Sequence, residues 1–535
     1  MRGKCNFSRV LILLSTLTCC VQALPQPAET QSQRILKREL GSAIKRSNTP
    51  RTIKAIDVYS RKNRREIYAF NSGFLLNPAS NLKIVTTSFA LSSLGTDYRF
   101  KTRFVSTGVR SHDTINGDLV VIACGDPLIT HDDLDSIARI ISGKGIKSIS
   151  GRLVIDVSKF DSVEWGSGWM WDDEPDQYQM FISPACIDHN TIMVHVSVDS
   201  SGRKLIVTTT PVTGFVCVVS TAVQDMVDSL YVTRVMAGDT NTISVSGTYS
   251  ANLPTRQHKF SLRYPAEYFG TVLKEALDRN GIRVQGHMVV DSRLEKPTTP
   301  AKIDTLLMFE DSIDTVVTFV DKISDNLGAE CLLREAASEI DGTAGSATRG
   351  ISMECNFLQQ CGVDSNEYCI ADACGLSRYN LITPDAIVKV LDHDLSQPYA
   401  SLFMHSLPLS GNDGTLEKRL DQDITAGRVY AKTGSINGVS TLSGFVLLPQ
   451  DTLVFSMMMQ NFIGSGDSIR ALQDSLCTIL ALYNDKPREF ASNLKRHHVG
   501  TYWEVYRRNE MRKHERNRLV RMKSRPIESR KDSSH

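Results

Sequence analysis

The heptapeptide NPASNLK, residues 77–83, decides how the rest of this chain is organised. Asn77 can cap a helix, and Pro78 suits the first turn, where no backbone N–H is needed. Apolar residues then recur every three or four positions, which predicts a buried helix. Ser80 and Lys83 therefore share one face near the positive end of the helix dipole. An ammonium group there lies beside a hydroxyl, where a developing anion would be stabilised.

Two further short motifs follow along the chain. Ser324-Asp325-Asn326 comes after a predicted helix at 313–320, and Lys432-Thr433-Gly434 lies in a predicted strand at 429–436. A serine and a lysine near a helix start are common, so the first motif is weak evidence by itself. S-x-x-K, S-D-N and K-T-G in this order, however, occur together in class A β-lactamases and penicillin-binding proteins.

The residue types in the motifs suit nucleophilic catalysis. A serine hydroxyl is a weak nucleophile and needs a base beside it. Lys83 can be that base if burial and a second cation, Lys432, lower its pKa so that the amine is partly neutral. Ser324 can relay a proton between Lys83 and the leaving nitrogen, and Asn326 can hold Lys83 or a substrate carbonyl. This chemistry calls for no metal and no cofactor.

The strand that carries K-T-G also supplies the expected substrate-binding groups. Its backbone can pair with a strand-like peptide, and Gly434 leaves room for the ligand to approach closely. Lys432 and Thr433 suit a terminal carboxylate. The backbone N–H groups of Ser80 and Ser435 form the expected oxyanion hole.

These motifs resemble those of the active-site serine penicillin-recognising enzymes. About 240 residues separate the first two motifs, far more than a β-lactamase has, as the resemblance implies. The chain is similar to the low-molecular-mass class C penicillin-binding proteins, the D-alanyl-D-alanine carboxypeptidase/endopeptidase family, over about residues 35–485. Further matching segments lie at 125–127, 372–380 and 407–415.

The resemblance implies an α/β (α+β) fold. Its core is a penicillin-binding/β-lactamase-like transpeptidase domain, an antiparallel sheet flanked by helices. One β-rich inserted domain, which itself carries a smaller one, interrupts it. One departure from the family is Ala373-Cys374 in place of the usual Gly-Ser, which puts the conformation of that loop in doubt.

The resemblance also implies a subsite for the amine-bearing third residue of the stem peptide. Arg378 would border it, together with Asp172 and Asp173 at the end of the segment WMWDD, residues 169–173. The competing interpretation is that a Trp-Asp cluster of this kind only anchors a loop.

The order of predicted elements divides the chain into five parts. We expect a signal peptide at 1–23, a first part of the catalytic domain at 24–103, an inserted β-rich domain at 104–296, a second part of the catalytic domain at 297–485 and a basic tail at 486–535. Within the insertion, segments 115–121, 145–156 and 281–291 resemble one another. They predict neighbouring strands of one sheet, because their irregular spacing fits a solenoid poorly.

The N-terminal segment predicts export. Basic residues precede an apolar run from Val10 to about Thr18, and Val21-Gln22-Ala23 offers small residues before a cleavage site. The run is too short for a membrane anchor, and Leu17-Thr18 fits a lipidation box poorly. We therefore expect a periplasmic or extracytoplasmic, cell-wall-associated protein. Nine cysteines remain beyond this segment, and export permits disulfides, whereas the spacings within 355–374 match no familiar zinc pattern.

The tail at 486–535 holds 15 Lys or Arg against 6 Asp or Glu, although the whole chain is only +2. Such a tail can bind anionic wall polymer or lipid, or it can be a solvated end. Export argues against nucleic acid as a partner.

Three functions compete. The leading hypothesis is an exported serine DD-peptidase that hydrolyses D-Ala-D-Ala ends and D-Ala crosslinks of peptidoglycan stem peptides through an acyl-Ser80 intermediate and is inhibited by β-lactams. A β-lactamase or esterase on the same fold is the alternative. The insertion disfavours it, as does the lack of a glutamate motif for deacylation between Asn326 and Lys432. A wall-binding module with a decayed site is the third hypothesis, and the intact motif residues disfavour it.

Overall fold

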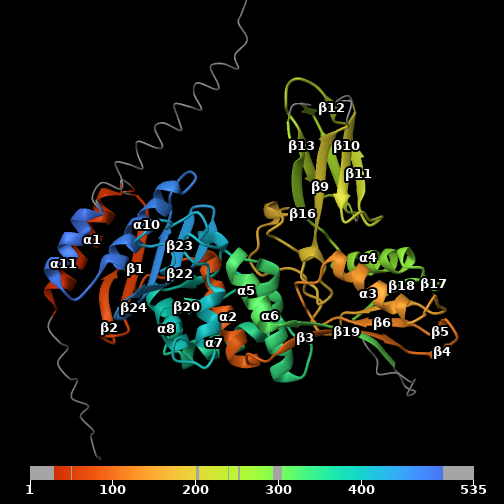
Figure 1. Cartoon of the computed structure of the whole chain (residues 1–535), viewed down its shortest axis with the longest axis horizontal. Coiled ribbons are helices and arrows are strands. Elements are labelled where there is room, and N and C mark those ends of the chain that lie inside the picture. Colours follow the sequence, from red (N-terminus) through yellow and green to blue (C-terminus); the bar gives the residue numbers. More distant parts are fainter. Residues whose placement is uncertain are drawn as a thin grey trace, which may run out of the picture.

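The computed structural model describes residues 29–47, 49, 51–199, 204–238, 240–250, 253–292 and 304–497. The expected signal peptide at 1–23 and residues 498–535 of the expected tail lie outside this part of the chain. Among the described helices, none combines the length and the apolar character that crossing a membrane requires. A main domain, which carries the three motifs, and an inserted domain lie side by side (Figure 1).

The main domain is built on a five-stranded antiparallel sheet in the order β2-β1-β24-β23-β22. The strands are β1 (Ile53–Ser60), β2 (Arg65–Phe70), β22 (Val429–Ile436), β23 (Val439–Leu448) and β24 (Asp451–Gln460). β1 pairs with β24 along its whole length. An early and a late segment of the sequence therefore lie next to each other within the sheet. The K-T-G strand predicted at 429–436 is confirmed, and β22 is an edge strand.

Helices cover both faces of this sheet (Figure 1). One face packs against α1 (Gln31–Arg46), α10 (Asp467–Leu482) and α11 (Pro487–Arg496). The other face packs against a layer that contains α2 (Leu82–Leu94), α5 (Ile313–Ile323), α6 (Asn326–Asp341), α7 (Ala347–Gln360), α8 (Pro384–Asp394) and α9 (Ala400–Ser406). This is the predicted antiparallel sheet flanked by helices.

The helix that follows Ser80 is more buried than its sequence pattern predicted. A 3-10 turn, η1 (Ala79–Asn81), precedes α2, and every residue from Leu82 to Leu91 is buried. α2 therefore packs on all sides and not along one stripe. Gly95 ends the helix with φ of 80°, a conformation that favours glycine.

Residues 487–496, which the charge count assigned to the tail, form α11 instead. Phe490 is fully buried and Leu494 nearly so, and the helix contacts α1 and α10. The basic residues Lys495 and Arg496 lie on its exposed side. The tail boundary expected at 486 is thus too early, because net charge does not distinguish an amphipathic helix from a solvated end.

The inserted domain contains two sheets, in the orders β18-β8-β6-β3-β19 and β17-β7-β5-β4. Helices α3 (His131–Gly143) and α4 (Pro265–Arg279) pack in the same hydrophobic core. The strands are β3 (Arg99–Ser106), β4 (Val109–Ser111), β5 (Thr114–Asn116), β6 (Leu119–Ile122), β7 (Ser148–Ile149), β8 (Leu153–Asp156), β17 (Arg283–Val284), β18 (Met288–Asp291) and β19 (Asp304–Ser312).

The three sequence repeats form neighbouring strands, as predicted, and these strands are parallel. Each repeat, however, breaks into two strands at a glycine, so the repeats contribute to two sheets and not to one. A Cβ atom on Gly151 would lie 2.5 Å from Gly117 O, and one on Gly286 would lie 2.5 Å from Gly151 O. The break is therefore a place where three backbones approach too closely for side chains.

The insertion begins and ends differently from the sequence expectation. β19 pairs antiparallel with β3, so the segments that enter and leave the insertion form one ladder. Residues 99–103 and 304–312, which we assigned to the catalytic domain, belong to the inserted sheet. The sequence could not show this, because long-range strand pairing leaves no local mark.

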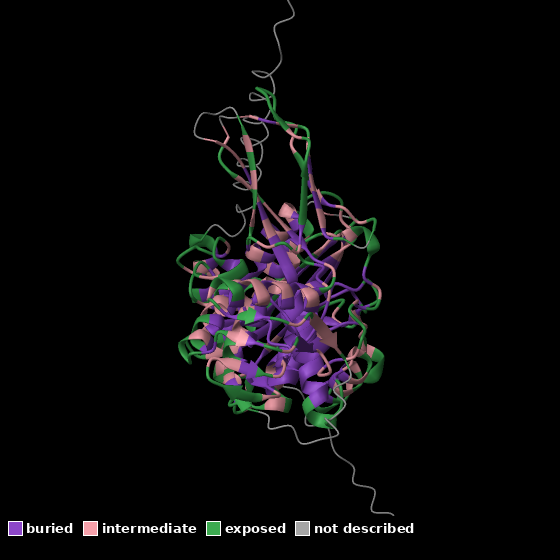
Figure 2. Cartoon of the chain, turned by 90° about the vertical axis from the view of Figure 1, so that its right-hand side faces the viewer, coloured by how far each residue is buried: buried purple, intermediate pink, exposed green. Residues whose placement is uncertain are grey.

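A smaller unit of strands projects from the inserted domain (Figures 1 and 2). Its sheets are β10-β9-β16, β11-β14-β13 and β12-β15. The strands are β9 (Thr191–Val198), β10 (Leu205–Thr210), β11 (Cys217–Ser220), β12 (Val223–Gln224), β13 (Tyr231–Arg234), β14 (Thr242–Ser246), β15 (Thr248–Tyr249) and β16 (Arg256–Ser261). Most of the residues in this smaller unit are exposed or half-buried, whereas many residues in the rest of the molecule are buried (Figure 2).

Candidate active site

The side chain of Lys83 connects the first motif with the second. Lys83 Nζ donates hydrogen bonds to Ser80 Oγ at 3.1 Å, to Asn326 Oδ1 at 2.6 Å and to the backbone oxygen of Cys374 at 2.7 Å. Three acceptors match the three protons of an ammonium group, and the side chain is fully buried. The sequence placed Ser80, Lys83 and Asn326 in one site, and the structure brings them together.

The third motif contributes a second serine–lysine pair. Lys432 Nζ donates hydrogen bonds to Ser324 Oγ at 2.8 Å and to Thr433 O at 3.1 Å. Ser324 lies between α5 and α6 in the left-handed region, with φ 65° and ψ 41°. That conformation is uncommon for a residue other than glycine. Residues with such strained backbones occur most often at functional sites, which agrees with a catalytic role for Ser324.

Burial changes the protonation of this lysine pair. Desolvation lowers the pKa of Lys83, while the thiol of Cys374 and the carboxyl of Asp372 oppose the shift. Desolvation and the charge of Lys83 lower the pKa of Lys432 to about 7, against the opposing charge of Asp321. The buried pair therefore loses a proton more readily than two exposed lysines would, which favours a neutral amine that can act as a base.

The turn before Ser80 is strained and held from several sides. Ala79 has φ of 46°, and its N–H donates to Asn77 Oδ1 at 2.9 Å. Thr441 Oγ1 donates to Pro78 O at 2.8 Å. A Cβ atom on Gly375 would lie 1.9 Å from Ala79 O. The surrounding loops thus fix the backbone of the nucleophile in a conformation it would not adopt alone.

Gly434 has a different role from the one that we predicted. A Cβ atom at this position would lie 2.2 Å from Thr441 Oγ1, 2.8 Å from Pro78 O and 3.0 Å from Asn81 N. The space beside Gly434 is filled by the chain itself, so the glycine allows β22 to approach the Ser80 turn and not a ligand to approach β22. Thr433, its neighbour, places Oγ1 2.8 Å from Thr415 Oγ1.

A cavity of about 610 Å³ opens beside Ser80. The predicted residues Ser80, Ser324, Asn326 and Ser435 line it, while Lys83 and Lys432 are buried behind this surface. Sequence reasoning missed the other lining residues, which are Tyr178, Gly375, Leu376, Ile436, Asn437, Gly438, Phe462, Gly464, Ser465 and Arg470. Most of them lie in loops or at strand ends that only the fold brings together.

The expected subsite residues divide into two groups. Arg378 and Asp173 line the cavity, whereas Asp172 is exposed and lies outside the described residues that line it. Arg378 Nη1 donates to the backbone oxygen of Asn437 at 2.9 Å, and Asp173 Oδ1 accepts from Tyr178 OH at 3.0 Å. An arginine and a carboxylate therefore face one space.

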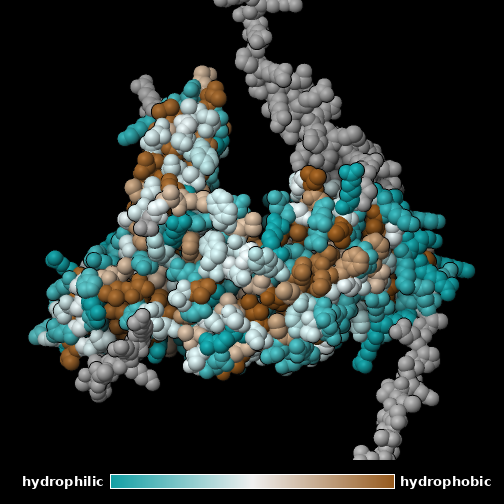
Figure 3. All heavy atoms as spheres, turned by 180° about the vertical axis from the view of Figure 1, so that it is seen from behind, coloured by the Kyte–Doolittle hydropathy of each residue, from teal (hydrophilic) through white to brown (hydrophobic). Residues whose placement is uncertain are grey.

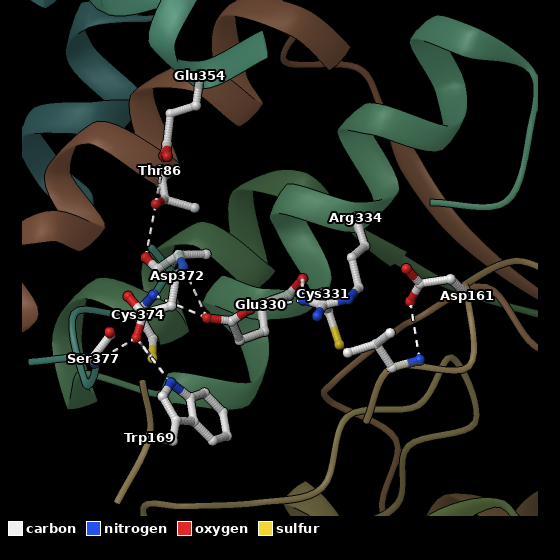
Figure 4. A network of polar contacts seen from close by, with 12 residues as sticks. Thr86, Asp161, Trp169, Glu330, Cys331, Arg334, Glu354, Asp372, Cys374 and Ser377 are labelled. Carbon is white, nitrogen blue, oxygen red and sulfur yellow. Dashed lines mark hydrogen bonds and ion pairs between the residues drawn. The ribbon is translucent and has the colours of Figure 1, made fainter. Parts of the chain in front are cut away.

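The segment WMWDD, residues 169–173, both anchors a loop and contributes a residue to the cavity, so the two interpretations of it are compatible. Trp169 is 8% exposed, and its Nε1 donates to Asp372 Oδ2 at 2.9 Å, so this residue anchors the loop (Figure 4). Trp171 is 74% exposed. The anchor at Trp169 holds the segment so that Asp173 reaches the cavity.

A buried acidic network supports the loop at 372–380 (Figure 4). Glu330, Asp372 and Cys374 place ligand atoms within 4.8 Å of one another, close enough to hold a metal. However, Glu330 Oε1 accepts the N–H groups of Ala373 and Cys374 at 2.9 and 3.2 Å, and Oε2 accepts Arg334 Nη1 at 2.7 Å. The Glu330 carboxylate is thus already occupied.

The Asp372 carboxylate also has its oxygens engaged in hydrogen bonds. It accepts the N–H groups of Gly375 and Ser377 and the side-chain amide of Asn380, at 2.7–2.8 Å. These bonds hold the loop that offers the Cys374 carbonyl to Lys83. Ala373-Cys374 therefore preserves the contact to the lysine, since that contact uses the backbone and not the side chain.

The helix-flanked sheet, the strained serine turn and the buried lysine pair together define a penicillin-binding-type serine hydrolase. The chain belongs to the D-Ala-D-Ala carboxypeptidase 3 (S13) family, whose model matches residues 36–482. The predicted family is confirmed, and so is the prediction of a serine-type D-Ala-D-Ala carboxypeptidase/endopeptidase, a hydrolase.

Individual relatives agree with this assignment. The chain is 30% identical to the D-alanyl-D-alanine carboxypeptidase of Actinomadura sp. (strain R39) over 507 aligned residues. The alignment covers 90% of this chain and 91% of the relative. It is 23% identical to the penicillin-sensitive carboxypeptidase A of Dictyostelium discoideum, over 80% of this chain and 86% of that protein.

A solved structure confirms the fold. Penicillin binding protein 4 (dacB) from Haemophilus influenzae matches with a TM-score of 0.71 at 23% identity, covering 83% of this chain and 99% of that chain. The predicted penicillin-binding/β-lactamase-like fold class is therefore correct.

Proposed function

We propose that this chain is an exported peptidoglycan DD-peptidase, which hydrolyses D-Ala-D-Ala ends and D-Ala crosslinks through an acyl-Ser80 intermediate. The observation that carries the proposal is the 3.1 Å contact between Lys83 Nζ and Ser80 Oγ at the edge of an open cavity. Family membership supports the reaction type, and the 2.8 Å contact between Lys432 and Ser324 supports a proton relay.

In the first half-reaction, neutral Lys83 takes the Ser80 proton while Oγ attacks the carbonyl carbon of the penultimate D-Ala. The N–H groups of Ser80 and Ser435 stabilise the oxyanion. The C–N bond then breaks, and the leaving amine receives a proton through Ser324. In the second half-reaction, water loses a proton to Lys83 and attacks the acyl carbon, the C–O bond to Ser80 breaks, and Lys83 returns the proton to Ser80 Oγ.

The substrate lies along the edge strand β22. Residues 408–410 already bond the first part of the outer side of β22, so the peptide backbone pairs with the part of that side beyond Ala431, as peptides do at other sheet edges. Thr433 contacts the terminal carboxylate, and Lys432, buried behind it, attracts that group by its charge. Arg378 and Asp173 contact the third residue of the stem peptide, a role that their place in the cavity supports.

β-Lactams inhibit the enzyme by acylating Ser80 in place of the peptide. Two relatives support this part of the proposal, because their names describe them as penicillin-sensitive and penicillin-binding. The reaction opens the lactam C–N bond and leaves a stable ester.

Attachment to anionic wall polymer or lipid through the basic tail completes the proposal. Hydrophilic side chains gather at the end of the molecule that carries α1 and α11, from which the tail continues (Figure 3). The tail attracts anions by a force that salt screens over roughly 8–10 Å.

One experiment tests the catalytic proposal. The purified protein is incubated with a peptide that ends in D-Ala-D-Ala, and released D-Ala is measured, while a fluorescent penicillin reports covalent labelling. Mass spectrometry then locates the penicilloyl group. Release of D-Ala together with a label on Ser80 is expected, and a label on another residue would refute the assignment.

A further inference from the structure

A second pocket lies on the inserted domain, next to the segment that carries Asp173. Its volume is about 370 Å³, and its lining residues are Glu164, Trp165, Glu174, Phe181, Arg263 and Tyr264. Asp173 and Tyr178, from the same segment, line the cavity at Ser80. Residues 164–181 therefore form part of the wall of both cavities, although this second pocket has no role in the mechanism above.

Three aromatic side chains line the pocket, those of Trp165, Phe181 and Tyr264. The Trp165 ring centre lies 5.1 Å from that of Phe181 and 5.6 Å from that of the anchored Trp169. Tyr264 is 38% exposed and has φ 62° and ψ 59°, a left-handed conformation that is costly for a tyrosine. A large ring held at a strained, exposed position is unusual unless something packs against it.

The polar groups of the pocket are of two kinds. Glu174 is bound by two arginines, since Arg263 donates from Nε at 2.8 Å and from Nη2 at 3.2 Å, and the buried Arg234 donates as well. Glu164 is exposed, and within the described part of the chain no hydrogen bond or ion pair to its carboxylate is found. The pocket thus offers a hydrogen-bond acceptor at its rim and a rigid charged floor.

We propose that this pocket binds an N-acetylated amino sugar of the glycan strand. A pyranose ring has an apolar C–H face that packs on aromatic rings and an edge of hydroxyl and amide groups that can donate to Glu164. Both arginines are engaged with Glu174, and a sugar whose acid group is amide-linked to the peptide is neutral, so its binding requires no new ion pair.

This inference rests on the proposed function, because in peptidoglycan the glycan strand is joined to the stem peptide that Ser80 would cleave. It extends that function in one respect. The inserted domain would recognise the sugar while the main domain cleaves the peptide, so the enzyme would prefer peptides attached to glycan over free peptides.

Sugar binding can be measured without catalysis. Tetra-N-acetylchitotetraose is titrated into the full chain, and tryptophan fluorescence and ligand-observed NMR follow binding. Tyr264→Asn removes the ring but keeps a residue that tolerates the left-handed conformation, so folding should be retained. We expect binding to weaken by about tenfold. The control Tyr231→Thr removes another exposed tyrosine, on β13, and should bind as the wild type does.

A catalytic readout separates the pocket from the active site. In Tyr264→Asn, kcat/KM should fall for a disaccharide-linked pentapeptide and stay unchanged for the free pentapeptide. Saccharide binding by a wild type that cleaves neither peptide would sink the proposed function but support the pocket. Cleavage of both peptides by a wild type that does not bind the saccharide would overturn the pocket, and so would equal saccharide affinity in the wild type and Tyr264→Asn.

Discussion

Lys432 Nζ lies 2.8 Å from Ser324 Oγ, so the second lysine of the site holds the second serine, while Lys83 holds the first at 3.1 Å. Each lysine is fully buried, and each serine lines the cavity. The two pairs divide the work of moving protons, since one can activate the nucleophile and the other can deliver a proton to the leaving group. This division gives the first two predictions.

Replacing Ser80 by Ala should abolish both D-Ala release and covalent penicillin labelling, because Ser80 Oγ is the hydroxyl that contacts the Lys83 amine and lines the cavity, whereas the nearby Cys374 thiol is fully buried. Lys83→Ala should retain the nucleophile but slow acylation by about 10²–10⁴-fold, the usual worth of general-base help. Rapid-quench labelling with fluorescent penicillin measures both effects. Labelling of Ser80→Ala at the wild-type rate would show that the acylated residue is elsewhere.

The rate of acylation should rise with pH as the buried lysine pair loses a proton. Lys83 works as a base only when neutral, and burial already lowers the pKa values of both lysines, that of Lys432 to about 7. In Lys432→Met the neighbouring positive charge is gone, so the pKa of Lys83 should rise and the ascending limb should move to higher pH. A pH profile of kcat/KM for both proteins tests this. An unmoved limb would mean that the two amines are not coupled.

Gly375→Ala should displace the nucleophile. Its new Cβ would meet Ala79 O at 1.9 Å, next to Ser80, and the residue has φ of 86°. Gly362→Ala is the matched control, because it has φ of 81° and open space around its Cβ position. Both variants should lose about 1–2 kcal/mol from the left-handed conformation. Only Gly375→Ala should also lose acylation activity, by at least about tenfold, as one ångström of misplacement is costly.

Glu354 should make the protein less stable as the pH rises. Thr86 Oγ1 lies 2.7 Å from Glu354 Oε1 and 2.8 Å from Ala373 O. One hydroxyl proton cannot serve both contacts, so both are hydrogen bonds only if the carboxyl is protonated and donates to Thr86. Burial accordingly raises the pKa of Glu354 to about 8.

The folded state therefore holds a proton on Glu354 that the unfolded state releases at lower pH. The free energy of unfolding should fall by on the order of 1 kcal/mol per pH unit between about pH 5 and 8 from this group. Glu354→Gln, whose amide can donate to Thr86, should flatten that dependence. Urea titrations of both proteins across this range provide the measurement, and parallel curves would contradict the assignment.

Truncation should separate the last helix from the tail. A chain that ends at His497 keeps α11 and should retain its melting temperature and its turnover of a small D-Ala-D-Ala peptide. A chain that ends at Asp485 exposes the surface that Phe490 and Leu494 cover, and each of these side chains contributes about 1.5–3 kcal/mol of burial. Its melting temperature should fall by several degrees. Equal melting of the two chains would show that α11 adds no stability.

Sequence reasoning was accurate where the signal is local. Ser80 and Lys83 lie one turn apart, so helical geometry alone places them together, and the K-T-G strand was predicted with the bounds 429–436 that the structure shows. It failed where contacts involve the backbone or distant segments. The Cys374 carbonyl that accepts from Lys83 leaves no mark in the sequence, because any residue supplies a carbonyl.

The glycine and domain-boundary errors have the same cause. Gly434 lies in a motif that suggested contact with a ligand, yet its neighbours Pro78 and Thr441 come from other elements. β19 looks like the start of the main domain because nothing local shows that its partner is β3. In each case the deciding atom belongs to a segment far away along the chain.

The pairing of β1 with β24 determines when this protein can become active. β1 and the Ser80 turn are synthesised early, but the strand that completes the sheet beside β1 ends at Gln460. Lys432 and the rest of the third motif also come late. A chain that does not yet include β24 therefore cannot hold Ser80 in its strained turn, and it should not react with peptides or penicillin before the residues up to Gln460 have been made. The nucleophile is among the first parts of the site to be synthesised and among the last to work.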